Sequence, residues 1–310
     1  MVEDIKKVEL HLHLDGSIML DTAKRLSKLD NVEDQMIGSN ASNLKEYLTK
    51  FDLPISLMQT KENIKLISQD LIKKLESDNV IYAEIRFCPL FHIKEGLSLD
   101  GVIESILEGL KSEKVKTNLI LCMMRGFSFE ENIKIIELAY KYLNKGVVAI
   151  DLAGDEKGHK LKENIELFKI AKEKNIPFTI HAGEVDDIDV IDAINLGVTR
   201  IGHGIKSNKE ELGLIKEKNI LLEVCPTSNI DTKAFDSYNE HNIYNLYKNG
   251  INISINTDNM TVSNIDLNKE YKKLIDNFGF TIQDLININK NAIKYAFISE
   301  EEKQELLNKY

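Results

Sequence analysis

Strand-like apolar runs alternate with helical stretches along almost the whole sequence. The runs lie at residues 8–14, 80–87, 118–124, 147–153, 177–182, 200–204, 220–225 and 251–257. Charged stretches with helical periodicity separate most of them, such as LDGVIESILEGLKSE and KENIELFKIAKEKN. Eight strands with intervening helices predict an α/β protein with a (β/α)8 (TIM) barrel and extra helices after the first strand and at the C-terminus. The alternative is a doubly wound sheet, but DGSIML, after the first run, lacks its glycine-rich fingerprint.

The first connection, residues 15–79, is long enough to contain helices of its own. Four apolar residues in it recur at the helical spacing i, i+3, i+4 and i+7: Leu44, Tyr47, Leu48 and Phe51. The alternative is a helix that only packs on the barrel rim, but the segment directly follows the first strand and so lies at the end where barrel active sites are built. This position favours a lid that closes over a substrate. The prediction is one metal-dependent hydrolase domain, residues 1–310, with a helical lid at about 38–60.

Two histidines alternate with leucines in the first run, VELHLHLDGS. Side chains at i and i+2 of a strand point the same way, so His11 and His13 share one face. Two adjacent imidazoles on a core strand are costly unless they bind something. Because neutral imidazole suits zinc and similar ions, the pattern favours a metal site over a solvated edge strand.

Further side chains of the types that bind metal ions come at the ends of later predicted strands. His181 ends one predicted strand, His203 a second and Asp258 a third, and Glu184 comes three residues after His181. A closed barrel brings these strand ends together on one face. Three imidazoles and a carboxylate suit one divalent ion with room for a water molecule. The sequence therefore predicts a metal centre at this end of the barrel.

Composition and net charge limit the kinds of partner that this protein is expected to bind. The formal net charge is −10, with acidic and basic residues interspersed, which argues against nucleic acid and anionic membranes. No apolar run approaches a membrane span, and MVEDIKKVEL has no signal-peptide core. Three scattered cysteines predict neither a disulfide framework nor a thiolate zinc cluster. We expect a soluble, cytoplasmic protein that acts on a small molecule, and the oligomeric state stays open.

Seven short stretches, in order along residues 8–258, resemble the adenosine deaminase family of zinc-dependent hydrolases: VELHLHLDGS, YAEIRF, DLAGDE, HAGE, RIGHG, CPTSN and NTD. The resemblance implies one Zn²⁺ per chain. It also implies hydrolytic deamination of adenosine and 2′-deoxyadenosine to inosine and deoxyinosine plus ammonia, with zinc-activated water attacking purine C6.

The resemblance also implies a role for each matching residue. The zinc ligands would be His11, His13, His181 and Asp258, with His13 also facing the substrate. His203 would orient or deprotonate the water, and Glu184 would be the acid at purine N1. The backbone of Gly154 would contact N3, Asp15 would hold a ribose hydroxyl, and the four lid residues would cover the substrate.

The chemistry accounts for these residue types on its own terms. Zinc lowers the pKa of bound water to about 7, which makes a nucleophile available at neutral pH. Asp258 and His203 can accept its proton beside the metal. Attack at C6 places electron density on N1, so a protonated carboxyl is needed there, and burial would raise the pKa of Glu184. Without the resemblance, Glu184 could be a solvated loop carboxylate, and Asp15 and Gly154 ordinary turn residues.

One departure from the family concerns Asn259. The family commonly has two consecutive aspartates here, the second of which contacts purine N7, whereas this chain has Asp258-Asn259. Substrate preference therefore stays open among adenosine, adenine, 5′-methylthioadenosine and an N6-substituted adenosine nucleotide. Asp15 stands where adenine deaminases tend to have glutamate, which favours a nucleoside. A catalytically inactive, metal-bound interaction protein is the alternative from another class, and Glu184 and His203 argue against it.

Overall fold

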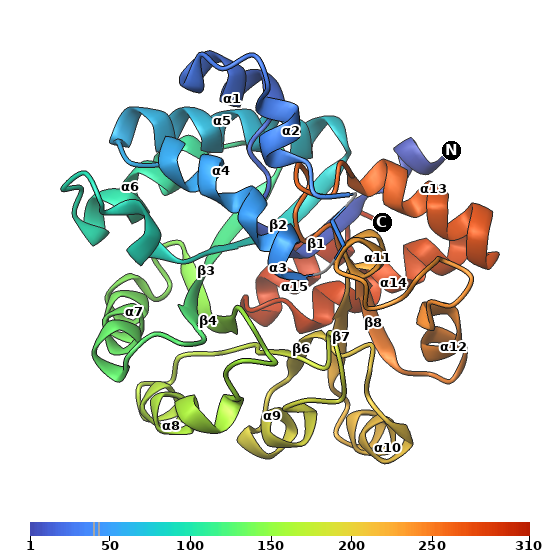
Figure 1. Ribbon diagram of the computed structural model, residues 1–310. Helices are drawn as coiled ribbons and strands as arrows, with labels where there is room; N and C mark the ends of the chain where they lie inside the picture. The colour runs from blue at the N-terminus through green and yellow to red at the C-terminus, as the bar shows by residue number, and fades with distance from the viewer. Residues whose placement is uncertain (40, 43) are drawn as a thin grey trace.

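Parallel strands form a ring that is surrounded by helices (Figure 1). The computed structural model describes residues 1–39, 41–42 and 44–310, without the side chains of Leu44 and Lys45. The strands in this part of the chain are β1 (Lys7–His13), β2 (Val80–Phe87), β3 (Lys116–Met124), β4 (Val147–Ala153), β5 (His181–Ala182), β6 (Arg200–His203), β7 (Leu221–Val224) and β8 (Asn252–Ile255).

The strands pair in sequence order, β1 to β4 and β5 to β8, with every pair parallel. Backbone hydrogen bonds join the two sets at both seams. The N–H of Ile150 donates to the Pro177 carbonyl (3.0 Å) beside β4 and β5, and the N–H of His13 donates to the Asp258 carbonyl (2.7 Å) beside β8 and β1. The sheet is therefore a closed barrel, and the predicted (β/α)8 fold is confirmed.

Helices follow most strands, as the alternating pattern predicts. Those that the structure describes are α1 (Leu20–Ser27), α2 (Val32–Met36), α3 (Leu44–Leu48), α4 (Asp52–Leu57), α5 (Lys61–Ser77), α6 (Leu99–Gly109), α7 (Phe129–Tyr142), α8 (Ile165–Glu173), α9 (Val190–Leu196), α10 (Lys209–Glu217), α11 (Pro226–Asp231), α12 (Ile243–Lys248), α13 (Leu267–Phe278), α14 (Ile282–Tyr295) and α15 (Glu300–Leu307), with 3-10 turns η1 (Val2–Asp4), η2 (Thr49–Phe51), η3 (Pro89–His92) and η4 (Leu161–Asn164).

Local sequence explains where these helices begin. At α7, the Ser128 hydroxyl accepts from the N–H of Glu131, while the Glu131 carboxylate accepts from the N–H of Ser128. This reciprocal cap satisfies backbone donors that the first turn leaves unpaired. One strand is shorter than expected: only His181–Ala182 of residues 177–182 forms β5. Pro177 has no N–H to donate, so that end of the segment bonds to β4 through its carbonyl.

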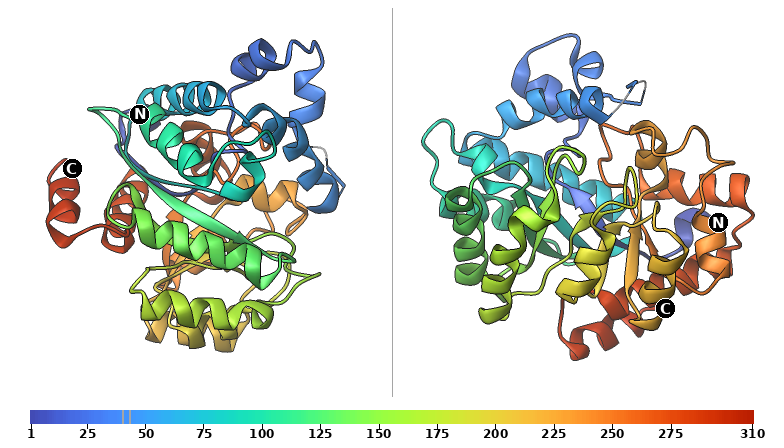
Figure 2. Two further views of the ribbon diagram at one scale, coloured as in Figure 1. Left: turned by 90° about the vertical axis from the view of Figure 1, so that its left-hand side faces the viewer. Right: turned by 60° about the horizontal axis from the view of Figure 1, so that its bottom comes forward.

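The two ends of the barrel carry different additions. The segment from α1 to α4 lies at the end where the strands finish, whereas α14 and α15 cross the opposite end (Figure 2). The predicted extra helices after strand one and at the C-terminus are therefore both present. None of the helices in the described ranges has the length and apolar character needed to cross a membrane.

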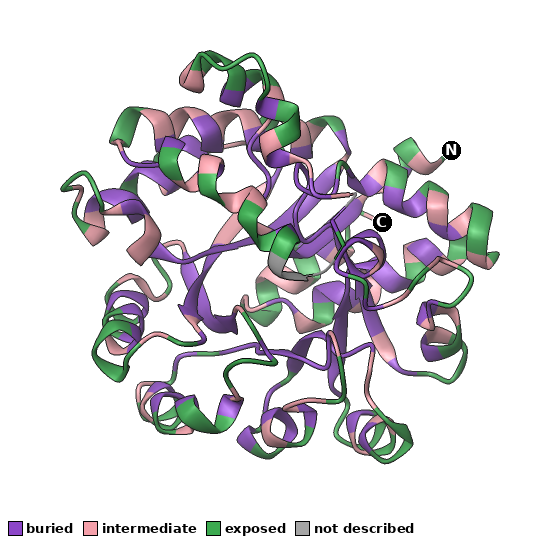
Figure 3. Cartoon of the chain, viewed as in Figure 1, coloured by how far each residue is buried: buried purple, intermediate pink, exposed green. Residues whose placement is uncertain are grey.

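The interior contains both an apolar core and a set of buried charged side chains. The strands are buried almost throughout, and the helices expose only their outer faces (Figure 3). Leu12 and Leu14 of the first run pack in the main apolar cluster. The barrel also buries charged side chains completely: Glu9, Glu84, Arg86, Asp151, Arg200 and Glu223. Such groups are stable inside a protein only when they are paired, and their partners lead to the candidate site.

Candidate active site

Histidine and aspartate side chains converge where the barrel strands end. His11 and His13 come from β1, His181 from β5 and His203 from β6, and Asp258 follows β8. The Nε2 atoms of His13 and His181 are 3.3 Å apart. The Oδ1 atom of Asp258 lies 3.4 Å from the Nε2 atoms of both His11 and His13. The structure thus brings together all the residues predicted to form the metal centre.

Two buried carboxylates orient the imidazoles. The Nδ1 atom of His11 lies 2.9 Å from Glu223, and that of His181 lies 2.9 Å from Asp151. The Glu223 carboxylate accepts the Nδ1–H of His11, which leaves the Nε2 lone pair of that ring free, and Asp151 lies at ion-pair distance from the His181 ring. The Nε2 atom of His11 is buried and has no hydrogen-bond partner. An orphaned lone pair beside two more imidazoles and a carboxylate fits a divalent cation, so the residues present suit the metal that the sequence implies.

Sequence reasoning missed both of these carboxylates. Asp151 and Glu223 each stand inside an otherwise apolar strand, VVAIDLA and LLEV, and that contrast was the signal available. Arg86 joins them, with Nη1 at 2.8 Å from Asp151 and Nη2 at 2.8 Å from Glu223. The Nε atom of Arg200 pairs with the other carboxylate oxygen of Glu223, Oε1 (2.7 Å). The charged barrel interior is thus one network that ends on the metal-type histidines.

Asp258 is held from two sides. The Ser228 hydroxyl donates to its Oδ2 (2.6 Å), and its backbone adopts a left-handed φ of 59°. Such a conformation is uncommon for a non-glycine residue and persists where the surroundings impose it, here the backbone bonds to β1. Burial opposes ionisation, but the surrounding histidines outweigh it and hold the pKa of Asp258 well below its usual value. The carboxylate is therefore ionised at neutral pH.

A chain of buried hydrogen bonds sets the tautomer of His203. The N–H of Ile243 donates to His241 Nδ1 (3.1 Å), so His241 carries its proton on Nε2, 3.3 Å from Asn229 Oδ1. That contact orients the Asn229 amide so that its Nδ2 donates to His203 Nδ1 (3.1 Å). Burial lowers the pKa of His203 well below its usual value, so the ring is neutral. Its proton is consequently on Nε2, which points toward Glu184 (3.8 Å) and Asp258 (4.0 Å).

Glu184 is buried beside this cluster. Burial raises its pKa to about 8, and the nearby charges of Glu156 and Asp258 act in the same direction. The carboxylate of Glu156 accepts a hydrogen bond from the backbone N–H of Glu184 (3.2 Å). The side chain of Glu184 is therefore mostly protonated at neutral pH, in the direction expected from the sequence.

A cavity of about 390 Å³ lies between the cluster and the segment from α3 to α4. The predicted site residues that line it are His13, Asp15, Tyr47, Leu48, Phe51, Gly154, His181, Glu184, His203, Asp258 and Asn259. His11 lies behind them, fully buried. The side chain of Leu44 lies outside the described part of the chain. A cavity of this size, lined by both apolar side chains and convergent polar groups, suits one small organic molecule.

The cavity contains polar groups without partners. Burial raises the pKa of Asp15 to about 7, and its Oδ1 has no hydrogen-bond partner. The Oδ1 atom of Asn259 is likewise unpaired and faces Gly16, where an added Cβ would lie 1.9 Å from it. Gly154 has a φ of 104°, which favours glycine and exposes its backbone to the cavity. The Asp15 carboxyl and the Gly154 backbone are therefore available to a ligand.

The helical segment over the cavity rests on the loop after β8. The buried hydroxyl of Tyr47 lies 2.8 Å from the Ser263 hydroxyl, and the N–H of Gly38 donates to the Val262 carbonyl (2.7 Å). Leu48, with 40% of its surface exposed, lies at the outer edge. Tyr47, Leu48 and Phe51 of the expected apolar stripe thus form one wall of the cavity, in α3 and η2.

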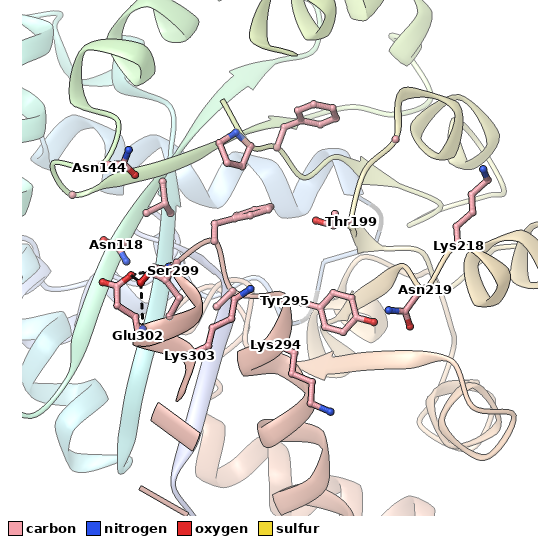
Figure 4. Close-up of a pocket in the computed structure, with 18 residues that line it drawn as sticks. Asn118, Asn144, Thr199, Lys218, Asn219, Lys294, Tyr295, Ser299, Glu302 and Lys303 are labelled. Carbon is pink, nitrogen blue, oxygen red and sulfur yellow. Dashed lines mark hydrogen bonds between the residues drawn. The ribbon is translucent and has the colours of Figure 1, made fainter. Parts of the chain in front are cut away.

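A second cavity, of about 860 Å³, lies beside α14 and α15 (Figure 4). Its lining includes Lys218, Lys294, Tyr295 and Lys303 at the opposite end of the barrel. None of the predicted site residues lines it. Its larger volume therefore does not make it the chemical centre.

Comparisons with known proteins agree with this geometry. The family model described as adenosine deaminase matches residues 6–310. A curated adenosine deaminase from Clostridium botulinum is 44% identical, covering 97% of each chain, and one from Clostridium perfringens is 39% identical, covering 98% of this chain and 97% of that one.

Solved structures are similar over the same length. The Arabidopsis N6-mAMP deaminase MAPDA has a TM-score of 0.91 at 26% identity, covering 100% of this chain and 99% of its own. Arabidopsis ADAL in complex with IMP has a TM-score of 0.89 at 26% identity, covering 98% and 96%. An adenine deaminase from Arthrobacter aurescens, at 22% identity and a TM-score of 0.85 over 98% and 97%, supports the fold.

Proposed function

Because the chain belongs to the adenosine deaminase family, we propose that its cavity binds adenosine and 2′-deoxyadenosine and that water replaces their 6-amino group. The products are inosine or deoxyinosine and ammonia. The observation that carries this proposal is a protonated carboxyl, Glu184, beside a histidine–aspartate cluster in one enclosed cavity. Identity of 44% with an adenosine deaminase over nearly the full length supports adenosine as the substrate.

The cofactor in this proposal is one Zn²⁺ per chain. His11, His13, His181 and Asp258 would hold it, since three neutral nitrogens and a carboxylate suit zinc and leave a position for water. When bound, zinc lowers the pKa of that water to about 7. The orphaned Nε2 atom of His11 supports this ligand set.

Two residues share the handling of the water. His203 carries its proton on Nε2 and so donates a hydrogen bond, which supports an orienting role for it rather than deprotonation. Asp258 is ionised and has a carboxylate oxygen 4.0 Å from that Nε2. We therefore assign the acceptance of the water proton to Asp258.

Glu184 supplies the acid. Attack at C6 moves electron density to N1, and a carboxyl with a pKa of about 8 holds a proton there at neutral pH. The protonated side chain donates to N1 during the attack. Asp258 then passes the proton that it took from the water to the 6-amino group, so that ammonia leaves, and the remaining hydroxyl proton returns to Glu184 as the C6 carbonyl forms.

The remaining lining residues recognise the nucleoside. In this assignment the Gly154 backbone contacts N3, and Asp15 holds a ribose hydroxyl. Asn259 directs its Oδ1 toward Gly16, so its Nδ2 is the atom available to donate to N7. Tyr47, Leu48, Phe51 and Leu44 form the lid, at about residues 38–60 of a single hydrolase domain spanning 1–310.

A second candidate is deamination of an N6-substituted adenosine nucleotide. The similarity to the Arabidopsis N6-mAMP deaminase favours it, and Lys94 lines the cavity where a phosphate could meet a cation. Asp15 and Asp52 line the same cavity and disfavour an added negative charge. Adenosine therefore remains the first candidate.

Formation of the 6-oxopurine product decides between these substrates, because N6-methyl-AMP would release methylamine and not ammonia. Purified protein should convert adenosine and 2′-deoxyadenosine to their 6-oxopurine products faster than adenine, 5′-methylthioadenosine or N6-methyl-AMP. Faster conversion of N6-methyl-AMP would reverse the order of the two candidates. No conversion of any of the five compounds by zinc-loaded protein would exclude the proposed function.

The proposed setting is a reducing compartment, the cytoplasm. Cys88, Cys122 and Cys225 are buried free thiols, which fits such a compartment.

A further inference from the structure

Arg125, which follows β3, joins three loops without lining the cavity. Its side chain is completely buried. The guanidinium donates to the backbone carbonyls of His181 (2.7 Å) and His159 (2.7 Å), and it pairs with the carboxylate of Asp189 (2.6 Å). A planar guanidinium can hold several acceptors in one fixed geometry. Arg125 therefore ties the loops after β3, β4 and β5 to one point.

Two partners of Arg125 are the two ends of the loop 181–189, which carries Glu184. The middle of the loop is held separately, because the N–H of Glu184 donates to the buried carboxylate of Glu156 (3.2 Å). The loop is fixed at its start, middle and end. A loop held at three points has little freedom to move, so the Glu184 carboxyl that it carries is also held in place.

Asp189 shows that the anchoring at the far end has a conformational cost. Its φ is 65°, a left-handed value that aspartate adopts at some expense. Its Oδ2 accepts from both Arg125 and the N–H of Leu161 (2.8 Å). Strained backbone persists where neighbouring contacts impose it, and it concentrates near functional sites. The ion pair with Arg125 and the bond from Leu161 are the side-chain contacts that hold Asp189 in this conformation.

We propose that Arg125 and Asp189 are positioning residues that hold Glu184 in place for protonation of the substrate. The proposal rests on the proposed role of Glu184. Neither residue contacts the cavity, so their effect would be on geometry, and a displacement of about 1 Å can reduce a rate about a hundredfold.

The test variant is Asp189→Asn. Asparagine tolerates the left-handed conformation and can still accept from Leu161, but it has no charge to pair with Arg125. The matched control is Asp186→Asn. It removes an ion pair between Asp186 and Lys157 (3.2 Å) that joins the loops after β4 and β5 but is more than half exposed. Exposed pairs of this kind contribute little.

Three measurements are made on the zinc-loaded proteins: adenosine kinetics, zinc content and hydrogen exchange across residues 183–188. For Asp189→Asn, we expect kcat to fall about 10- to 100-fold with a smaller change in KM, and exchange to accelerate. Zinc content should match wild type, because Asp151 orients His181 independently of the loop. Asp186→Asn should behave as wild type throughout.

Two results would overturn the proposal: wild-type kcat and exchange in Asp189→Asn, or equal losses in both variants. Arg125→Lys, which can satisfy one partner but not all three, should lose at least as much kcat as Asp189→Asn. If wild-type protein itself does not deaminate adenosine, the proposed function fails. Hydrogen exchange then still decides whether the ion pair holds the loop.

Discussion

At the residue scale, the proposed chemistry depends on one proton on Glu184. Glu184→Gln keeps the shape of the side chain but removes the acidic proton, so activity should fall at least about a hundredfold, the usual scale of a general acid. Zinc content and nucleoside binding should remain, because Glu184 is not one of the proposed zinc ligands. Steady-state kinetics and metal analysis check this, and near-normal turnover would show that another group is the acid.

The same proton sets a pH limit. The pKa of Glu184 is raised to about 8, so the side chain is protonated below that pH and loses its proton above it. We expect kcat/KM for adenosine to decline above about pH 8, and Glu156→Gln to shift the decline to lower pH by removing a neighbouring negative charge. A decline that stays in place in Glu156→Gln would assign it to another group.

Recognition of N7 is a second residue-scale question. An asparagine amide can donate to N7 at any pH, and the Oδ1 atom of Asn259 lies against Gly16. A 7-deaza analogue leaves this donor unpaired, so its affinity should fall by roughly 1–3 kcal/mol relative to adenosine. Asn259→Ala should lose this discrimination. Equal discrimination by both proteins would show that Asn259 does not contact N7.

At the element scale, α3 depends on a contact with the loop after β8. Tyr47→Phe removes the hydroxyl that bonds to Ser263, a loss of about 1 kcal/mol for a typical hydrogen bond. A less firmly closed lid should raise KM for adenosine several-fold with unchanged zinc content. Tyr140→Phe is the control, since Tyr140 is 54% exposed and on α7. An unchanged KM in Tyr47→Phe would show that the Tyr47–Ser263 hydrogen bond does not affect closure over the substrate.

At the scale of the whole molecule, the proposed metal links distant strands. His11 and His13 are on β1, His181 is on β5 and Asp258 follows β8, so a bound ion stabilises the closed barrel and has no equivalent site in the unfolded chain. Chelation should lower Tm and abolish activity, and added zinc should restore both. His13→Ala should show the low Tm without chelation. Full activity after exhaustive removal of metal would contradict the mechanism.

The sequence alone was sufficient for the barrel and for the face that carries the site. Strand and helix periods are local properties, and parallel strands of a barrel end on one face, so His11, His181 and Asp258 could be placed together from their positions at strand ends. The helical character of the segment over the cavity followed from the spacing of Tyr47 and Phe51 in the same way, although the structure divides it into α3 and η2.

Only the tertiary structure decided how these groups are oriented. The partners that orient His11, His181 and His203 are Glu223, Asp151 and Asn229, which lie 212, 30 and 26 residues away in the chain. Sequence periodicity reports which face a side chain occupies, but not which distant atom meets it. Hydrogen bonds, tautomers and pKa shifts depend on distances of a few ångströms between such atoms, and these exist only once the barrel has closed.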